Sequence, residues 1–233
     1  MQRIAITGGV AEGKTTVLRM FESLGASALS SDSVAATLLL PGTEVWEQLV
    51  KEFGQAILAA DGALARERLA TLAFGDPAAR RRLNRIMHPA VVRALQAQLD
   101  ACEPSVTPIF IEVPLLVEVA LQDFFDAIVV VQATPALQRR RLLERGMSPQ
   151  QARQILRAQL PTRCKAAFAD WVIRTHHPLE QVEAQARRIW RTLMHTPPGI
   201  LTSATESDVR RQNRAGVSRM TRNLTTEEEV RTQ

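Results

Sequence analysis

One stretch near the N-terminus has the residue types and the spacing of a phosphate-binding loop. The pattern G-x-x-x-x-G-K-[ST] is matched by Gly8, Gly13, Lys14 and Thr15. In such a loop the backbone N–H groups surround the β-phosphate of a nucleotide, the lysine reaches the β- and γ-phosphates, and the hydroxyl can coordinate Mg²⁺. The sequence therefore predicts a site for ATP and Mg²⁺ built from Gly8, Gly9, Ala11, Glu12, Gly13, Lys14, Thr15 and Thr16.

The residues that flank the loop favour the two elements it requires. Residues 4–7 form a short apolar run typical of a strand, and residues 14–24 carry apolar side chains at helical spacing. A loop between a strand and a helix N-terminus presents backbone donors and the positive end of the helix dipole to an anion. This context argues against a chance glycine-rich turn.

Further apolar runs that favour strands lie at residues 26–29, 108–113, 127–131 and 172–173, with helical patterns between them. The run 127–131 is uninterrupted, as expected of a parallel strand buried on both faces. Strands that alternate with helices predict an α/β fold. With the phosphate loop, this becomes a three-layer P-loop NTPase fold with a parallel sheet.

Two long stretches are predicted to be helical insertions. Residues 33–100 carry no convincing strand, and Asp76 is placed to cap a helix that Pro89 then kinks or breaks. Residues 135–168 are helical and rich in arginine, with a break at Gly146. Both insertions follow the C-terminal ends of predicted strands, which is the edge where open α/β sheets bind ligands.

The last third of the chain contains two more predicted features. Ser148 followed by Pro149 predicts a helix start, and residues 179–195 predict an amphipathic closing helix. Beyond that helix the composition changes to Ser, Thr, Arg, Glu and Asn, with few large apolar side chains. This change predicts a flexible tail at 197–233.

Two carboxylates are candidates for chemistry beside the loop. Asp32 follows the second predicted strand, where it either accepts the proton of an acceptor hydroxyl or caps a helix at 33–40. Glu112 ends the third predicted strand, where it either holds Mg²⁺ through water, as a Walker-B acid does, or is structural. The residues alone leave both pairs of alternatives open.

The basic side chains have a similar pair of interpretations. Arg141 and Arg145 lie four residues apart on one helical face, next to Arg139 and Arg140. Their guanidinium groups either clamp the phosphates of ATP or cover a solvated helix face. The position of His88 fits packing or capping better than catalysis.

The bulk composition limits the classes of protein that fit. The chain has 233 residues, a net charge of +5 and a pI near 10.2, but its arginines are scattered and form no basic stripe for nucleic acid. No apolar run approaches the ~20 residues of a membrane span, and no signal peptide is evident. With Cys102 and Cys164 far apart, a reduced cytoplasmic protein is the simplest interpretation. We expect small-molecule partners, no nucleic acid, no membrane, and a monomer or weak homo-oligomer.

Taken together, the motifs resemble the dephospho-coenzyme A kinase family over residues 1–190. The phosphate loop with its flanking Ile6-Thr7 and Thr16, and then Asp32, follow the spacing of that family. So do shorter blocks along the chain: Leu24-Gly25, Pro41-Gly42, Asp61-Gly62-Ala63-Leu64, Arg68, Phe74-Gly75-Asp76-Pro77, Leu83, His88-Pro89, Pro114-Leu115-Leu116, Glu118, Val129-Val130-Val131, Gln138, Arg141, Arg145, Gln159, Pro161, Lys165, Ala169-Asp170 and Val172-Ile173. This many blocks in register make the match specific.

The resemblance implies a reaction and the parts that carry it out. ATP would phosphorylate the ribose 3′-hydroxyl of dephospho-coenzyme A to give coenzyme A and ADP, the last step of coenzyme A biosynthesis. Residues 1–32, 101–136 and 169–196 would form the nucleotide-binding core. Residues 33–100 would bind the coenzyme A side, and residues 137–168 would form the lid.

The resemblance also implies roles for single residues. Asp32 would be the base, with Lys14 and Arg141 as the other catalytic groups. The lid residues Arg141 and Arg145 would bind ATP. The acceptor would be bound by Asp32, His88, Pro114 and Leu115.

The sequence departs from the family pattern at several places. Ser30-Ser31-Asp32 stands where Asp-Ala-Asp is usual, and Ala35-Ala36 where an arginine is frequent. Ala11-Glu12 replaces a common Gly-Ser, so the charge of Glu12 is expected to weaken ATP binding unless its side chain points outward. Arg174-Thr175 replaces Asp-Asn, which is expected to change contacts near the adenine. The loop lysine, the acid after the second strand and the lid arginines remain, so we expect an active enzyme.

Three other interpretations compete with this one. Another small-molecule P-loop kinase, acting on a nucleoside, a nucleotide or shikimate, would not account for the blocks at 74–77 and 88–89. A nucleotide-dependent binding module or nucleic-acid ATPase would need a hydrolytic acid pair or a basic stripe. A non-catalytic homologue is suggested by Glu12, Ser30 and Thr175, although each part of a phosphoryl-transfer site still has a candidate residue.

Overall fold

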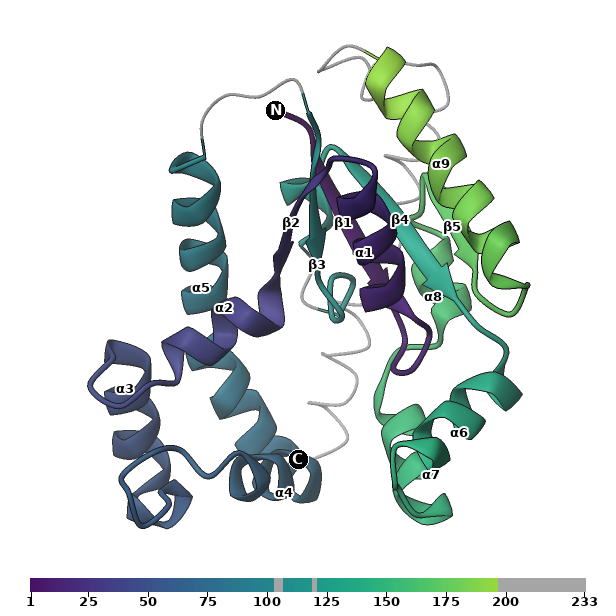
Figure 1. The fold of residues 1–233 in the computed structure, drawn as a ribbon. Coiled ribbons are helices and arrows are strands. Elements are labelled where there is room, and N and C mark those ends of the chain that lie inside the picture. Colours follow the sequence, from purple (N-terminus) through teal and green to yellow (C-terminus); the bar gives the residue numbers. More distant parts are fainter. Residues whose placement is uncertain (103–106, 119–120, 197–233) are drawn as a thin grey trace. The chain divides into compact units, whose positions relative to one another are not determined.

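A computed structural model describes residues 1–196 of the chain apart from 103–106 and 119–120 (Figure 1). The chain divides into two compact units. Residues 1–28 and the chain from residue 105 onward form the first, and residues 29–104 form the second. The tail predicted to be flexible lies outside the described residues.

The first unit is built on the predicted parallel sheet, whose strand order is β2-β3-β1-β4-β5. β1 pairs in parallel with both β3 and β4, and β4 pairs with β5, so their C-terminal ends share one edge. The α/β prediction is confirmed, and each predicted strand is present to within two residues. The strands are β1 (Arg3–Gly8), β2 (Ser27–Ser30), β3 (Ile109–Glu112), β4 (Ala127–Gln132) and β5 (Trp171–Arg174).

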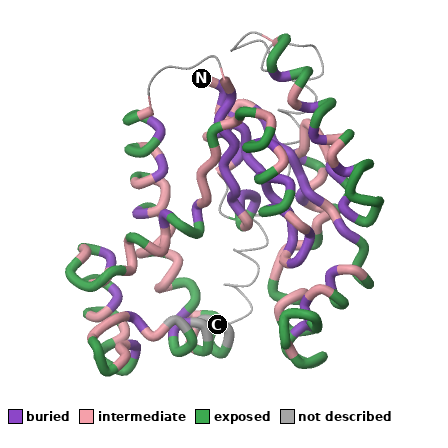
Figure 2. Tube along the Cα trace, in the orientation of Figure 1, coloured by how far each residue is buried: buried purple, intermediate pink, exposed green. Residues whose placement is uncertain are grey.

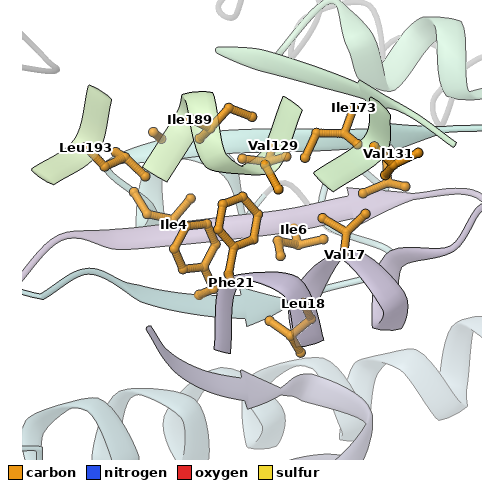
Figure 3. Close-up of a cluster of buried hydrophobic side chains, with 14 residues drawn as sticks. Ile4, Ile6, Val17, Leu18, Phe21, Val129, Val131, Ile173, Ile189 and Leu193 are labelled. Carbon is orange, nitrogen blue, oxygen red and sulfur yellow. The ribbon is translucent and has the colours of Figure 1, made fainter. Parts of the chain in front are cut away.

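Two amphipathic helices cover one face of this sheet (Figures 1 and 3). α1 (Lys14–Ser23) and α9 (Leu179–His195) bury their apolar sides against the strands. The ring of Phe21 on α1 stacks on Phe110 of β3, with centroids 3.9 Å apart. Each such buried side chain contributes about 1.5–3 kcal/mol, so the helix that follows the phosphate loop is firmly anchored.

Three short helices follow β4: α6 (Pro135–Glu144), α7 (Pro149–Ala158) and α8 (Thr162–Ala166). The break predicted at Gly146 is present, because its φ of 83° suits glycine and ends the helical path. The predicted start at Ser148 is a complete capping box, in which Ser148 and Gln151 satisfy each other's backbone N–H groups. α8 packs against β4 and β1.

The second unit is helical, as the absence of strand patterns predicted. Its helices are α2 (Ser31–Leu38), α3 (Glu44–Phe53), the 3₁₀ turn η1 (Gln55–Ile57), α4 (Arg66–Gly75) and α5 (Pro77–Asp100). Leu49, Ile57 and Leu95 are almost fully buried in it. Asp76 caps α5, as predicted, by accepting from the N–H of Ala78 at 2.7 Å.

Of the two alternatives predicted at Pro89, a kink or a break, the break is wrong, because α5 continues through Pro89 to Asp100. Proline removes one N–H from the helix. On the side of α5 that faces α3 and α4, the apolar side chains of Leu83, Ile86 and Ala90 still pack into the same cluster. Tertiary packing therefore outweighs the lost hydrogen bond.

The burial pattern follows the layers. The central strands β3, β1 and β4 are buried except at Arg3 and Gln132, which are partly exposed, whereas the helices alternate between buried and exposed positions (Figure 2). A 3₁₀ turn, η2 (Gln122–Phe124), leads into β4. In the described part of the chain, no helix combines the length and the apolar character that crossing a membrane requires.

Candidate functional site

The phosphate loop joins the C-terminal end of β1 to the start of α1. Gly13 is the N-cap of α1 with a φ of 95°, and Gly8 has a φ of 152°, so both occupy conformations that favour glycine. A side chain on Gly8 would collide with the carbonyl of Val131. Ala11 has a φ of 57° and is the non-glycine residue with positive φ among those described, at the position where the family commonly has glycine.

Lys14 lies within the loop and not in solvent. Its side chain is 8% exposed, and Nζ donates to the carbonyl of Gly9 at 2.9 Å. This contact holds the ammonium group over the loop that the sequence predicts to bind phosphates. A lysine held in this way supplies a point charge to a phosphate without first having to be ordered.

The predicted metal ligands lie next to each other. The hydroxyl of Thr15 donates to Oε2 of Glu112 at 3.2 Å, and Glu112 stands in register with Ile6 on the neighbouring strand. A hydroxyl and a carboxylate form an oxygen-only donor pair, which suits Mg²⁺ that keeps its remaining ligands as water and phosphate. Among the described residues, no group of three or more His, Cys, Asp or Glu side chains could hold a metal by itself.

The Glu12 side chain is turned into the protein. It is 1% exposed, and its carboxylate accepts hydrogen bonds from the Gly9 N–H and from the Thr162 hydroxyl, the latter at 2.8 Å. Burial raises the pKa of Glu12, and these hydrogen bonds and the charge of Lys14 oppose the rise. The sequence predicted weaker ATP binding unless this side chain points outward. The side chain is buried and contacts the loop from inside the protein, and its effect on ATP binding stays a prediction.

The raised pKa of Glu12 predicts a pH-dependent effect on stability. The folded protein binds this proton more tightly than the unfolded chain, so stability falls as pH rises from the ordinary value of 4.5 through the folded pKa. Glu12→Gln removes this contribution, so its stability relative to the wild type should rise with pH over that window. Urea unfolding at a series of pH values measures it. Glu183→Gln, which changes a glutamate paired with Arg187 on the surface of α9, is the control. A difference in stability between Glu12→Gln and the wild type that does not change with pH would contradict the prediction.

Of the two arginines predicted to belong to a lid, Arg141 contacts the loop. Its Nη1 donates to the carbonyl of Ala11 at 3.0 Å, and its Nη2 donates to the carbonyl of Thr175 at 3.3 Å. Burial, followed by the nearby charges of Arg140 and Arg145, lowers the pKa of Arg141, although a guanidinium remains protonated. Arg145 is the exposed C-cap of α6, and in the described structure it makes no such contact.

Thr175 supports the loop from the end of β5. Its hydroxyl donates to the carbonyl of Glu12 at 2.6 Å and it is 8% exposed. Its methyl group lies where a side chain on Gly13 would point. The departure from the family's Asp-Asn therefore puts a small side chain against the phosphate loop.

The turn after β3 is fixed by a buried lysine. Lys165 has no exposed surface, donates to the carbonyl of Pro114 at 2.8 Å, and forms an ion pair with Glu118 at 2.8 Å. The two residues of this turn that are predicted to bind the acceptor differ in how far a ligand can reach them. The Pro114 carbonyl accepts from the buried Lys165, whereas Leu115 is 41% exposed.

The remaining predicted site residues belong to the second unit. Asp32 is exposed in the first turn of α2, whose N-cap is Ser30, so the capping alternative for Asp32 is wrong. The carboxylate still favours the positive end of the helix dipole. His88 lies inside α5, half-buried, and burial lowers its pKa, which favours the neutral ring.

Sequence reasoning missed several side chains that touch the loop. Gln138 donates to the carbonyl of Val10 at 3.0 Å, and Gln159 accepts from the N–H of Val10 at 2.8 Å. Both glutamines were among the residues that match the family pattern, but the pattern did not indicate what they contact. Nothing in the sequence indicated Thr162, because its contact with Glu12 is made only in the folded chain.

A G-x-x-x-x-G-K-T loop between the first strand of a parallel α/β sheet and a helix, with an acid at the end of the adjacent strand, defines a P-loop nucleotide-binding protein. Comparison with known families gives a match to the model for dephospho-CoA kinase over residues 2–181. The chain belongs to the dephospho-CoA kinase family.

Relatives and solved structures agree with this assignment. Dephospho-CoA kinases of Leifsonia xyli subsp. xyli and Geobacter metallireducens are each 39% identical over 197 residues, which cover 83% and 84% of this chain and 99% and 98% of theirs. The crystal structure of TT1252 from Thermus thermophilus matches with a TM-score of 0.73 and 30% identity, over 82% of this chain and 96% of that one. Dephospho-CoA kinase from Campylobacter jejuni matches with a TM-score of 0.62 and 21% identity, over 82% and 96%, and shows the shared fold.

Proposed function

We propose that this protein uses ATP to phosphorylate the ribose 3′-hydroxyl of dephospho-coenzyme A, giving coenzyme A and ADP in the last step of coenzyme A biosynthesis. Family membership over residues 2–181 carries the proposal. The phosphate loop with its ordered lysine supports it, because phosphoryl transfer depends mainly on positioning and charge neutralisation.

For the nucleotide, we assign the phosphates to the loop. The N-terminus of α1 follows the loop, and a helix N-terminus favours an anion, while Lys14 adds a positive charge beside it. Arg141 already contacts the loop carbonyl of Ala11, so its guanidinium is placed to meet a phosphate oxygen at small cost. Arg145 would need the end of α6 to move before it could do so.

For the metal, we assign Mg²⁺ to Thr15 directly and to Glu112 through water. When bound, Mg²⁺ would neutralise charge on the β- and γ-phosphates. The hydroxyl-to-carboxylate contact of 3.2 Å holds both oxygens on one side of the loop. The carboxylate also stabilises the Thr15 orientation when the nucleotide is absent.

This metal assignment predicts a changed magnesium requirement. Thr15→Val and Glu112→Gln should each raise the Mg²⁺ concentration for half-maximal activity by ~10-fold or more, the range seen when supporting metal ligands are removed. Titration of Mg²⁺ at saturating ATP measures this. Thr192→Val and Glu183→Gln, on exposed positions of α9, are the matched controls. An unchanged Mg²⁺ requirement in both variants would rule out the assignment.

For the acceptor, we assign binding to the helical insertion 33–100 and to the turn that carries Pro114 and Leu115. Asp32 would accept the proton of the attacking hydroxyl, since an exposed carboxylate at a helix start is available to a substrate. Residues 137–168 would act as the lid, and closing it would keep water from the γ-phosphate. We place the protein in the cytoplasm, acting on small molecules as a monomer or weak homo-oligomer.

The choice of acceptor tests the proposal. The purified full chain is incubated with ATP and Mg²⁺, and ADP release is followed through a coupled reaction. We expect release that depends on dephospho-coenzyme A and not on adenosine, AMP or shikimate. ADP release that depends on one of these other acceptors would assign the protein a different substrate. ADP release that is equal with and without any acceptor would contradict the kinase proposal.

A further inference from the structure

A buried carboxylate connects the phosphate loop to the start of α8. Oε1 of Glu12 accepts from the Thr162 hydroxyl at 2.8 Å, while Oε2 accepts from the N–H of Gly9. The carboxylate is therefore shared between the loop and a residue 150 positions away in the sequence. A carboxylate that accepts two hydrogen bonds makes stronger contacts than a neutral group would.

The same segment makes two further contacts with the loop. The Val10 N–H donates to Oε1 of Gln159 at 2.8 Å, and Nζ of Lys165 lies 3.5 Å from the carbonyl of Gly8. Gln159 and Lys165 thus contact residues 10 and 8 directly, whereas Thr162 is joined to Gly9 through the Glu12 carboxylate. These contacts hold the beginning of the loop against one segment.

The middle contact leaves little free space. A side chain placed on Gly9 would approach Gln138 Nε2, Thr162 Oγ1 and the Glu12 carboxyl group within 3.2 Å. The N–H groups of residues 9 and 10 already donate to Glu12 and to Gln159.

We propose that Glu12 is a positioning residue for the nucleotide: through Thr162 it fastens the loop to the 159–165 segment and keeps it in the conformation that receives ATP. The proposal rests on the proposed function in taking ATP as the nucleotide. A shorter side chain at position 12, such as that of serine, lacks the carboxylate that joins Thr162 to Gly9. A loop freed from Thr162 would spend part of its time in conformations that bind phosphate poorly, and the apparent affinity would fall by the competent fraction.

The test is a double-mutant cycle read by ATP binding. Calorimetry with ATP and Mg²⁺, without acceptor, is applied to the full-length wild type, Glu12→Ala, Thr162→Val and the double variant. Because the Glu12 contact is a hydrogen bond to a charged group, each single variant should bind ATP about tenfold more weakly. The double variant should be no weaker than Glu12→Ala, because Thr162→Val breaks a contact that Glu12→Ala already removes.

Companion measurements separate positioning from folding. Thr162→Ser keeps the hydroxyl and should restore affinity to within about threefold of the wild type, and Thr192→Val on α9 is the matched control. Thermal unfolding confirms that each variant is folded at the assay temperature. With the acceptor present, KM for ATP should rise while kcat at saturating ATP stays within about twofold, since uniform binding alone is lost.

Three results would overturn the proposal. They are unchanged ATP affinity in both single variants, losses that multiply in the double variant, and tighter ATP binding in Glu12→Ala, which would mean that the Glu12 charge opposes the nucleotide. The outcome does not depend on the acceptor, because binding is measured without it. A failure to phosphorylate dephospho-coenzyme A would therefore leave the cycle interpretable.

Discussion

Replacing Lys14 with alanine is expected to abolish phosphoryl transfer. The Lys14 ammonium group is buried and ordered over the loop by its bond to Gly9. In a site shielded from water, loss of one preorganised electrostatic contact lowers turnover by ~10²–10³-fold, and loss of a full charge at the phosphates should exceed this range. Initial rates of ADP formation at saturating ATP and acceptor measure the effect.

Lys51 provides a matched control for Lys14. It is exposed in the last turn of α3, so Lys51→Ala should keep wild-type rates. Thermal unfolding of Lys14→Ala will show whether the fold survives. A folded Lys14→Ala protein with more than a tenth of wild-type turnover would remove Lys14 from the catalytic machinery.

Asp32→Asn is expected to lower kcat by ~10²–10⁴-fold, the range for a positioned general base. The amide keeps the size of the side chain and a first-turn position in α2, but it cannot accept the proton of the attacking hydroxyl. ATP binding, which we assign to the first unit, should stay within about twofold of the wild type, since Asp32 lies in the second unit. Steady-state kinetics together with ATP calorimetry separate the two effects.

Asp100, exposed at the end of α5, serves as the control for this substitution. Asp100→Asn should behave as the wild type in both measurements. Near-normal turnover in Asp32→Asn would mean that the carboxylate only stabilises the start of α2 through the helix dipole. The catalytic base would then have to be sought among other groups.

The sheet and the loop were predictable because their signals are local. The apolar run at 127–131 and the spacing of Gly13 and Lys14 depend on neighbours in the sequence, and the structure places both as expected. The caps at Asp76 and Ser148 are local in the same sense. Each of these features follows from backbone geometry and needs no distant partner.

The features that sequence reasoning predicted wrongly or missed are those that depend on contacts between residues far apart in the sequence. Pro89 lacks an N–H, which predicts a kink or a break, but α5 is continuous through Pro89 and packs against α3 and α4. The sequence also could not show that Thr162 lies beside Glu12 and donates to its carboxylate, so this contact was missed. The complete burial of Lys165 depends equally on Glu118 and on the Pro114 carbonyl.

The central claim is that a phosphate is transferred to the 3′-hydroxyl of dephospho-coenzyme A. The most direct measurement is the mass of the product formed from dephospho-coenzyme A, compared with that from a 3′-deoxy analogue, with ATP and Mg²⁺. We expect dephospho-coenzyme A to gain one phosphate and the 3′-deoxy analogue to gain none. A phosphate gained by the analogue would place transfer at another hydroxyl, and no gain by dephospho-coenzyme A would show that the protein does not phosphorylate it.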